Sequence, residues 1–232
     1  MFLKACFFQL SYFALTSKLL RIKIVCIFTN AMETKNTPHA IYAEMTPNPA
    51  TMKFVSDQML VPTHLLFEYS NLAEAKESPL AQQLFSFPFV TGVFIRTNYV
   101  TITKNDSIEW NEITLEIRDF ISNYLNKGGL VVLEKAKNKE ALTKENAPTV
   151  TTKPFTDVEK QIMAVLEEYV RPAVEGDGGA IEFERFENGV VSVVLRGACS
   201  GCPSSTMTLK AGIEGLLTRM VPEVKEVVAI NG

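Results

Sequence analysis

The sequence predicts an α+β protein of two small two-layer α/β domains joined by a flexible linker. Short β-prone runs alternate with amphipathic helical runs in both halves of the chain. Residues 134–153 are rich in Lys, Glu and Thr and lack aromatic side chains, so they can bury too little surface to offset their ordering entropy. The blocks on either side, at about 90 and about 80 residues, can each form a small core. We therefore expect domains at 40–133 and 154–232. A short exposed helix near 135–144 is the alternative for part of the linker.

The composition excludes several classes of protein. The 232 residues are 47% hydrophobic and 21% charged, with a net charge of −3. Disordered chains have fewer apolar residues and a larger net charge. A slightly acidic chain lacks the broad basic surface of a general nucleic-acid binder. The chain contains no uninterrupted run of 18 apolar residues, the length that a membrane-spanning helix needs. We expect neither a nucleic acid nor a membrane as partner.

The N-terminal extension, residues 1–31, contains no acidic residue. Its apolar stretches are interrupted, and no small-residue cleavage site follows them, which argues against a secretory signal. A mitochondrial transit peptide is also acid-poor, although it usually has more arginine than the single Arg21 found here. Alternatively, translation starts at Met32 and the extension belongs to no folded protein. The sequence thus predicts a cytoplasmic protein, or one of the mitochondrial matrix if the extension is a transit peptide.

The first domain is predicted to mix strands and helices in a defined order. Pro and Asn at 47–49 favour a turn between two strands, and Pro79 suits the first position of a helix. The expected elements are strands at 41–45 and 52–55, a short helix from Pro79, a hairpin of 90–96 with 99–104, and a helix at 110–126. The chain's only histidines, His39 and His64, have no ligand cluster beside them in sequence, so we expect surface or turn positions for both.

The second domain is predicted to run helix, strand, strand, helix, strand. Thr156 and Glu159 have the spacing of a capping box, and apolar residues from Val158 to Tyr169 follow at helical spacing. Arg171-Pro172 should perturb or end this helix. Asn188-Gly189 is a favoured hairpin turn between strands at 181–186 and 190–195. The second helix follows Pro203, with its apolar side formed by Leu209, Ile213, Leu216, Leu217 and Met220, and 224–230 forms the last strand.

Cys199 and Cys202 are the candidate site residues, and no catalytic residue is predicted. They form a Cys-x-x-Cys pair between a strand and a helix that starts at Pro203. The exposed N–H groups and positive dipole of a helix start favour thiolates there. Gly197 and Gly201 leave room for backbone donors to approach the sulfurs. The other cysteines, Cys6 and Cys26, lie in the N-terminal extension, and we expect no chemistry from them.

Four interpretations of the pair differ in the ligands they need. The two cysteines could be small buried residues at a turn. A structural zinc site needs four ligands, which one chain with this pair and no nearby histidine does not supply. A thioredoxin-like dithiol/disulfide redox protein needs only two cysteines, although its nucleophile usually starts the helix with the second cysteine in the first turn. An iron–sulfur cluster shared by two copies would receive two plus two thiolates.

The second domain resembles the C-terminal domain of NifU and of Nfu-type iron–sulfur cluster scaffold or carrier proteins. That resemblance rests on Arg171-Pro172, Asp177-Gly178-Gly179, Gly197-Ala198-Cys199-Ser200-Gly201-Cys202-Pro203-Ser204-Ser205, Leu209-Lys210 and Pro222-Glu223-Val224. The first domain resembles the Nfu N-terminal domain. Its matching residues are Thr46-Pro47-Asn48-Pro49, Met52-Lys53-Phe54, Ser78-Pro79-Leu80-Ala81, Leu84-Phe85, Val100-Thr101-Ile102-Thr103-Lys104 and Trp110.

The resemblance implies a non-enzymatic scaffold or carrier. Cys199 and Cys202 of two subunits would together bind a 4Fe-4S cluster, so cluster binding implies a homodimer; two thiolates per chain also suit a 2Fe-2S cluster. The cluster would come from upstream assembly proteins and pass to apo iron–sulfur target proteins. Transfer by stepwise exchange of thiolates needs no catalytic base.

Overall fold

The computed structural model describes residues 38–135, 155–200 and 203–231. The predicted N-terminal extension, most of the predicted linker and Cys202 lie outside the described residues. No helix within the described part of the chain is both long and apolar enough to cross a membrane.

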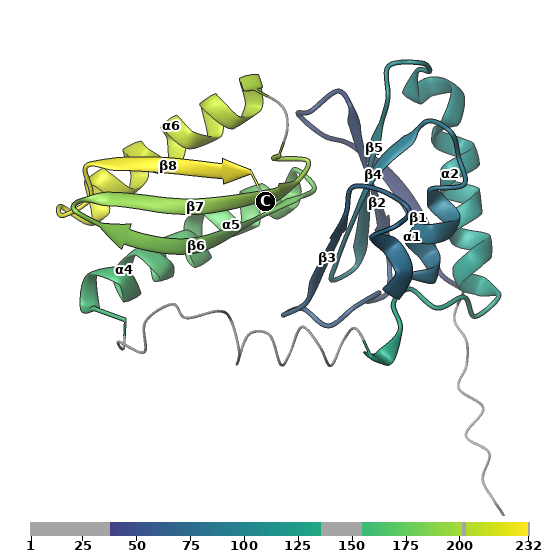
Figure 1. The fold of residues 1–232 in the computed structure, drawn as a ribbon, viewed down its shortest axis with the longest axis horizontal. Helices are drawn as coiled ribbons and strands as arrows, with labels where there is room; N and C mark the ends of the chain where they lie inside the picture. The colour runs from purple at the N-terminus through teal and green to yellow at the C-terminus, as the bar shows by residue number, and fades with distance from the viewer. Residues whose placement is uncertain (1–37, 136–154, 201–202, 232) are drawn as a thin grey trace, which may run out of the picture. The chain divides into compact units, whose positions relative to one another are not determined.

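The first domain contains a five-stranded antiparallel sheet (Figure 1). Its strands are β1 (Ile41–Met45), β2 (Thr51–Ser56), β3 (Leu66–Tyr69), β4 (Val90–Arg96) and β5 (Tyr99–Lys104). They lie in the order β1-β2-β5-β4-β3. β4 and β5 form the predicted hairpin, in which Arg96 pairs with Tyr99 across the turn at Thr97 and Asn98. Thr97 has a φ of 40°, in the left-handed region that β-branched residues rarely adopt but that two-residue hairpin turns require.

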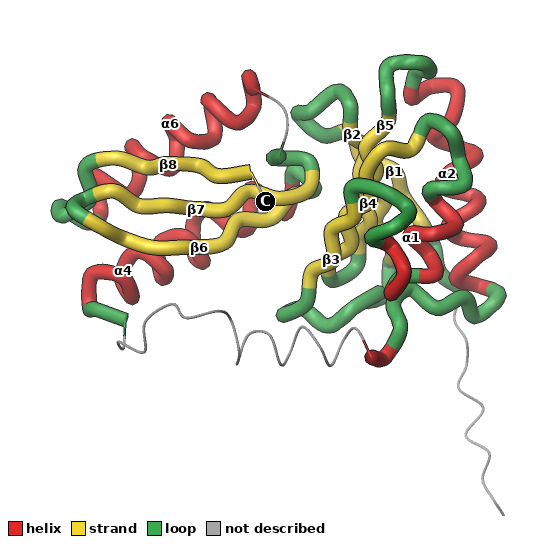
Figure 2. The backbone as a smooth tube through the Cα atoms, viewed as in Figure 1, coloured by secondary structure: helices red, strands yellow, loops and turns green. Residues whose placement is uncertain are grey.

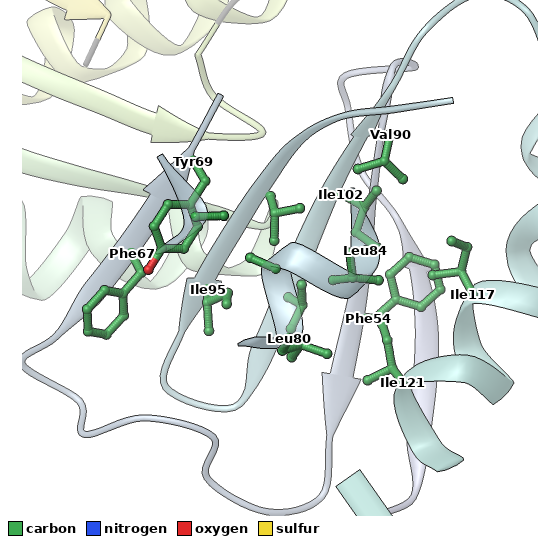
Figure 3. Packing of buried hydrophobic residues seen from close by; sticks show 14 of the residues in the cluster. Phe54, Phe67, Tyr69, Leu80, Leu84, Val90, Ile95, Ile102, Ile117 and Ile121 are labelled. Atoms are coloured by element: carbon green, nitrogen blue, oxygen red, sulfur yellow. The ribbon is translucent and has the colours of Figure 1, made fainter. Parts of the chain in front are cut away.

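The core of the first domain lies between this sheet and its helices (Figure 3). These helices are the one-turn η1 (Ala75–Glu77), α1 (Pro79–Leu84) and α2 (Trp110–Asn126). Pro79 opens α1 as predicted, and the Ser78 hydroxyl caps it by accepting a hydrogen bond from the Ala81 N–H. Apolar side chains from both elements fill the interface, among them Phe54, Leu80, Leu84, Ile95, Ile102, Ile117 and Ile121.

Strand β3 was not predicted from the sequence. It has only four residues, and its alternation of Leu66 and Glu68 with Phe67 and Tyr69 is too short to stand out as a strand pattern. Pairing with the edge of β4 stabilises it, and Phe67 and Tyr69 are buried in the core beneath. This strand is therefore a product of tertiary packing.

The second domain contains a three-stranded mixed sheet with helices (Figure 2). The strands are β6 (Gly179–Glu187), β7 (Val190–Gly197) and β8 (Glu226–Asn231), with β7 antiparallel to β6 and parallel to β8. The turn between β6 and β7 has positive φ at both Asn188 and Gly189, as a two-residue hairpin requires. The helices are α4 (Asp157–Val165), η2 (Leu166–Val170), α5 (Arg171–Gly176) and α6 (Pro203–Met220).

The first helix of this domain does not end at Arg171-Pro172. It continues from α4 through a π-helical segment, η2, into α5, with Pro172 in the first turn of α5. The π segment widens the turn, so the buried side passes through Val170, and Tyr169 is 50% exposed. The prediction that Tyr169 lies on the apolar face is therefore wrong. Met220, predicted on the apolar side of α6, is also 40% exposed.

The predicted fold class is confirmed. Both sheets, the capping box of Thr156 with Glu159, and the predicted order of elements in the second domain are present. The exact domain boundaries remain predictions. The described residues belong to one packed unit.

Candidate functional site

Cys199 lies in a tight turn immediately after β7. The Ser200 N–H donates to the Gly197 carbonyl oxygen at 3.1 Å, and the Ser200 hydroxyl donates to the same oxygen at 2.8 Å. The turn places Gly197 at a φ of +63°, which glycine accepts because it has no Cβ atom. The Ala198 N–H donates to the Gly178 carbonyl oxygen, so the turn is also bonded to the segment that enters β6. Backbone hydrogen bonds thus hold Cys199 in place from both sides.

Gly179 makes room for the Cys199 side chain. It pairs with Gly197 at the end of the β6–β7 ladder. A Cβ atom at Gly179 would lie 2.6 Å from the Cys199 Sγ and 2.7 Å from the Arg196 carbonyl oxygen. The missing side chain of Gly179 therefore allows the close approach of the thiol.

The Cys199 thiol is buried. Its side chain is part of the core of the second domain, with 6% of the residue exposed. Burial raises the pKa of the Cys199 thiol to about 12, and the negative charge of Asp177 contributes in the same direction. Burial acts on this thiol in the direction opposite to the one expected from the helix start, which favours a thiolate. Redox-active cysteines usually have lowered pKa values, whereas burial shifts the pKa of Cys199 upward.

An apolar groove opens beside Cys199. It has a volume of about 590 Å³, and its lining includes Tyr169, Ala173 and, from α6, Leu209, Gly212 and Leu216. Tyr169 is half exposed in this lining. Burial of Cys199 agrees with the interpretation of a small core residue, and the residue also lines the groove.

The structure describes only one of the two predicted site residues. Cys202 lies outside the described residues, one position before the start of α6 at Pro203. Among the described residues, no three His, Cys, Asp or Glu side chains gather into a metal-binding group. The two histidines are surface or turn residues, as predicted: His39 is hydrogen-bonded through Nδ1 to the Ser56 hydroxyl at 3.1 Å, and His64 lies in an exposed turn.

Sequence reasoning did not identify three neighbours of Cys199. Asp177 affects the thiol through its charge, Gly179 by its missing side chain, and Tyr169 through the groove wall. Asp177 and Gly179 were visible as part of a glycine-rich motif. Their proximity to Cys199 follows from the pairing of β6 with β7, which no local pattern specifies.

Models of known protein families match both domains. A model described as the scaffold protein Nfu/NifU N terminal matches residues 41–128. A model described as the NifU-like domain matches residues 162–228, which include Cys199 and Cys202.

Similar proteins extend over most of the chain. NifU-like protein 4, mitochondrial, of Arabidopsis thaliana is 35% identical over 192 residues, which cover 81% of this chain and 64% of that protein. The mitochondrial NFU1 iron-sulfur cluster scaffold homolog of Homo sapiens is 34% identical over 188 residues, which cover 81% of this chain and 70% of that protein. The chain thus spans about two thirds of the length of these relatives. A solved NifU-like protein from Saccharomyces cerevisiae is 28% identical over 43% of this chain and 89% of its own, with a TM-score of 0.36, too low to bear on the fold.

Proposed function

Because the chain belongs to the Nfu family of NifU-like proteins, we propose that it holds an iron–sulfur cluster and passes it to apo target proteins. The observation that carries the proposal is the position of Cys199. It lies in a strand-to-helix turn beside an apolar groove, and Cys202 follows it immediately before α6. The two thiolates of a Cys-x-x-Cys pair can ligate iron.

We propose that Cys199 and Cys202 of two chains together hold one 4Fe-4S cluster. The pair supplies two thiolates per chain, and a cluster takes four. The apolar groove beside Cys199 supports an interface at this position, because apolar surface next to the site gains from being covered. A cluster between two chains remains open to attack by a thiolate of a third protein, and stepwise exchange of thiolates then transfers it without a catalytic base.

The test is anaerobic reconstitution of the full chain with iron and sulfide. Optical and Mössbauer spectra distinguish a 4Fe-4S cluster from a 2Fe-2S cluster. We expect Cys199→Ala and Cys202→Ala each to lose bound iron and sulfide. Cys6→Ala and Cys26→Ala are matched controls, because these cysteines lie outside the motif, and both variants should load like the unaltered chain. Full iron and sulfide content in either motif variant would overturn the proposal.

The shared-ligand arrangement and the carrier role need separate measurements. Light scattering should show that loading converts monomers to dimers, and a loaded monomer would contradict ligation by two chains. Incubation of the loaded chain with an apo iron–sulfur protein should activate that protein. Strong reduction of insulin disulfides by the unloaded chain would instead favour a thioredoxin-like dithiol protein.

We further propose the mitochondrial matrix as the location, the alternative that the sequence left open for residues 1–31. Its support is that the matched relatives are named as mitochondrial. Immunofluorescence of the full chain against a matrix marker tests this, and a diffuse cytoplasmic signal would contradict it.

A further inference from the structure

The face of the five-stranded sheet opposite α1 and α2 carries side chains that are unusual for a solvent-facing sheet surface. The strand pairing places Lys53, Thr101, Phe94 and Glu68 in one row across β2, β5, β4 and β3. The next row contains Tyr99 and Arg96, with Val55 and Leu66 at its ends. We call these eight residues the outer sheet face. Five of them, Lys53, Phe94, Arg96, Tyr99 and Thr101, are each at most 8% exposed, so another part of the chain covers them.

The covering segments are the two glycine turns that flank Cys199. On the first turn, the Thr101 hydroxyl donates to the Gly178 carbonyl oxygen at 2.6 Å, and the Tyr99 hydroxyl donates to the Gly179 carbonyl oxygen at 2.8 Å. Lys53 donates through Nζ to the Gly176 carbonyl oxygen at 3.2 Å. Three side chains of the outer sheet face therefore bind three nearby backbone carbonyls, which is the pattern of a specific docking contact.

The second glycine turn is held by carboxylate and amide groups. Glu68 Oε1 accepts a hydrogen bond from the Gly197 N–H at 2.9 Å. Asn48, beside the outer sheet face, donates through Nδ2 to the Ala198 carbonyl oxygen at 3.2 Å. These contacts hold the backbone of the two residues that immediately precede Cys199.

An ion pair and an apolar contact complete this surface. Arg96 binds Glu175 Oε1 through its Nε at 2.9 Å and through a terminal guanidinium nitrogen at 2.8 Å. Phe94 and Tyr99 form a small buried cluster with Ala180. The arginine side chain is 7% exposed, so removal of Glu175 would leave a buried positive charge without its counter-charge.

The glycines of the motif fit this contact closely. A Cβ atom at Gly178 would lie 2.9 Å from the Thr101 Oγ1, and one at Gly197 would lie 2.9 Å from the Phe94 ring. Both glycines also have positive φ, of 81° and 63°. Small residues at these two positions let the outer sheet face reach the backbone of the turns.

We propose that the outer sheet face is a docking surface for the chain's own glycine turns, 175–180 and 196–198, and that it positions the backbone that carries Cys199. The partner is the second domain of the same chain. The chemistry of recognition is the binding of backbone carbonyls by hydroxyl, ammonium and amide donors, together with the Arg96–Glu175 ion pair.

The test measures whether the two domains tumble together in the apo full chain. Backbone ¹⁵N relaxation should give one rotational correlation time for amides of β5 and of β7. Arg96→Glu places two carboxylates together, and we expect loss of the common correlation time. Glu175→Arg should have the same effect, and the double exchange, R96E with E175R, should restore it. Arg118→Glu is the matched control, because Arg118 lies on α2 with its side chain 40% exposed and pairs with Asp119, and it should leave tumbling unchanged.

A second set of variants removes hydrogen bonds without altering charge. Tyr99→Phe with Thr101→Val deletes two hydroxyl donors, and we expect faster hydrogen exchange at the Gly197 N–H. Tyr42→Phe, a hydroxyl deletion on an exposed tyrosine of β1, should have no effect.

Three outcomes would overturn the proposal. The first is that the two domains of the unaltered chain have separate correlation times, and the second is that R96E keeps a common one. The third is that the apo chain is a dimer in which the contact forms between two copies. Because these measurements use the apo chain, they are independent of whether the chain binds a cluster.

Discussion

Gly179→Ala is the most direct test of how the site is packed. The residue starts β6, and its φ lies outside the positive range, so alanine meets no backbone strain there. The cost is steric. The added methyl group would lie 2.6 Å from the Cys199 Sγ and 2.7 Å from the Arg196 carbonyl oxygen. The carbonyl belongs to the paired strand β7 and cannot rotate away as a side chain can.

The expected loss is about 1–3 kcal/mol of unfolding free energy, the usual cost of overpacking a well-packed interior. Gly215→Ala is the control: it makes the same chemical change, but the free energy of unfolding should change in the opposite direction. Gly215 lies within α6, and a methyl group added there would have no atom from outside its own helix backbone within 4 Å. Alanine at this position should therefore stabilise the chain by about 0.5–1 kcal/mol, so the two substitutions should move stability in opposite directions.

Urea unfolding followed through the amide resonances of β7 measures the effect in the domain that contains the site. A loss of about 2 kcal/mol should lower the urea midpoint by about 1 M. The fluorescence of Trp110, the chain's single tryptophan, follows the first domain in the same titration. If Gly179→Ala leaves the β7 midpoint unchanged, or raises it as Gly215→Ala should, the close packing of the thiol on Gly179 is refuted.

Two further predictions concern the cap of α1 and the Cys199 thiol. Ser78→Ala removes the cap on the Ala81 N–H and the hydrogen bond to the Val131 carbonyl oxygen, and should cost about 1–2 kcal/mol in a urea titration read by tryptophan fluorescence. The exposed Ser86→Ala is its control, and equal midpoints for the two variants would contradict the role of the cap. Alkylation of Cys199 by iodoacetamide, followed by peptide mass spectrometry, should keep accelerating above pH 9.0 in the native chain, because a raised pKa moves thiolate formation to higher pH. In urea the rate should level off near that pH, and a plateau at the same pH in the native chain would show an ordinary thiol.

Local sequence patterns determined most of the secondary structure. The hairpin turn at Asn188-Gly189, the capping box at Thr156 and the helix start at Pro79 were all predicted, because each depends on a few neighbouring residues. The motif around Cys199 also indicated the family, and the matches to both domains confirmed it.

Tertiary structure decided what those patterns leave open. The four residues of β3 form a strand because β4 offers them an edge, and Tyr169 is exposed because the π segment shifts the buried side of its helix. Both depend on packing between residues that are distant in sequence or on a change of helical period.

The candidate site shows the same division. Sequence alone determined that this chain has one Cys-x-x-Cys pair, placed between a strand and a helix. Only the tertiary structure decided that Cys199 is a buried thiol packed on Gly179, and that the glycine turns beside it lie against the outer sheet face. The physical reason is that the pKa of a thiol and the fit of a glycine depend on the atoms that surround them in space, and strand pairing brings those atoms together from distant parts of the chain.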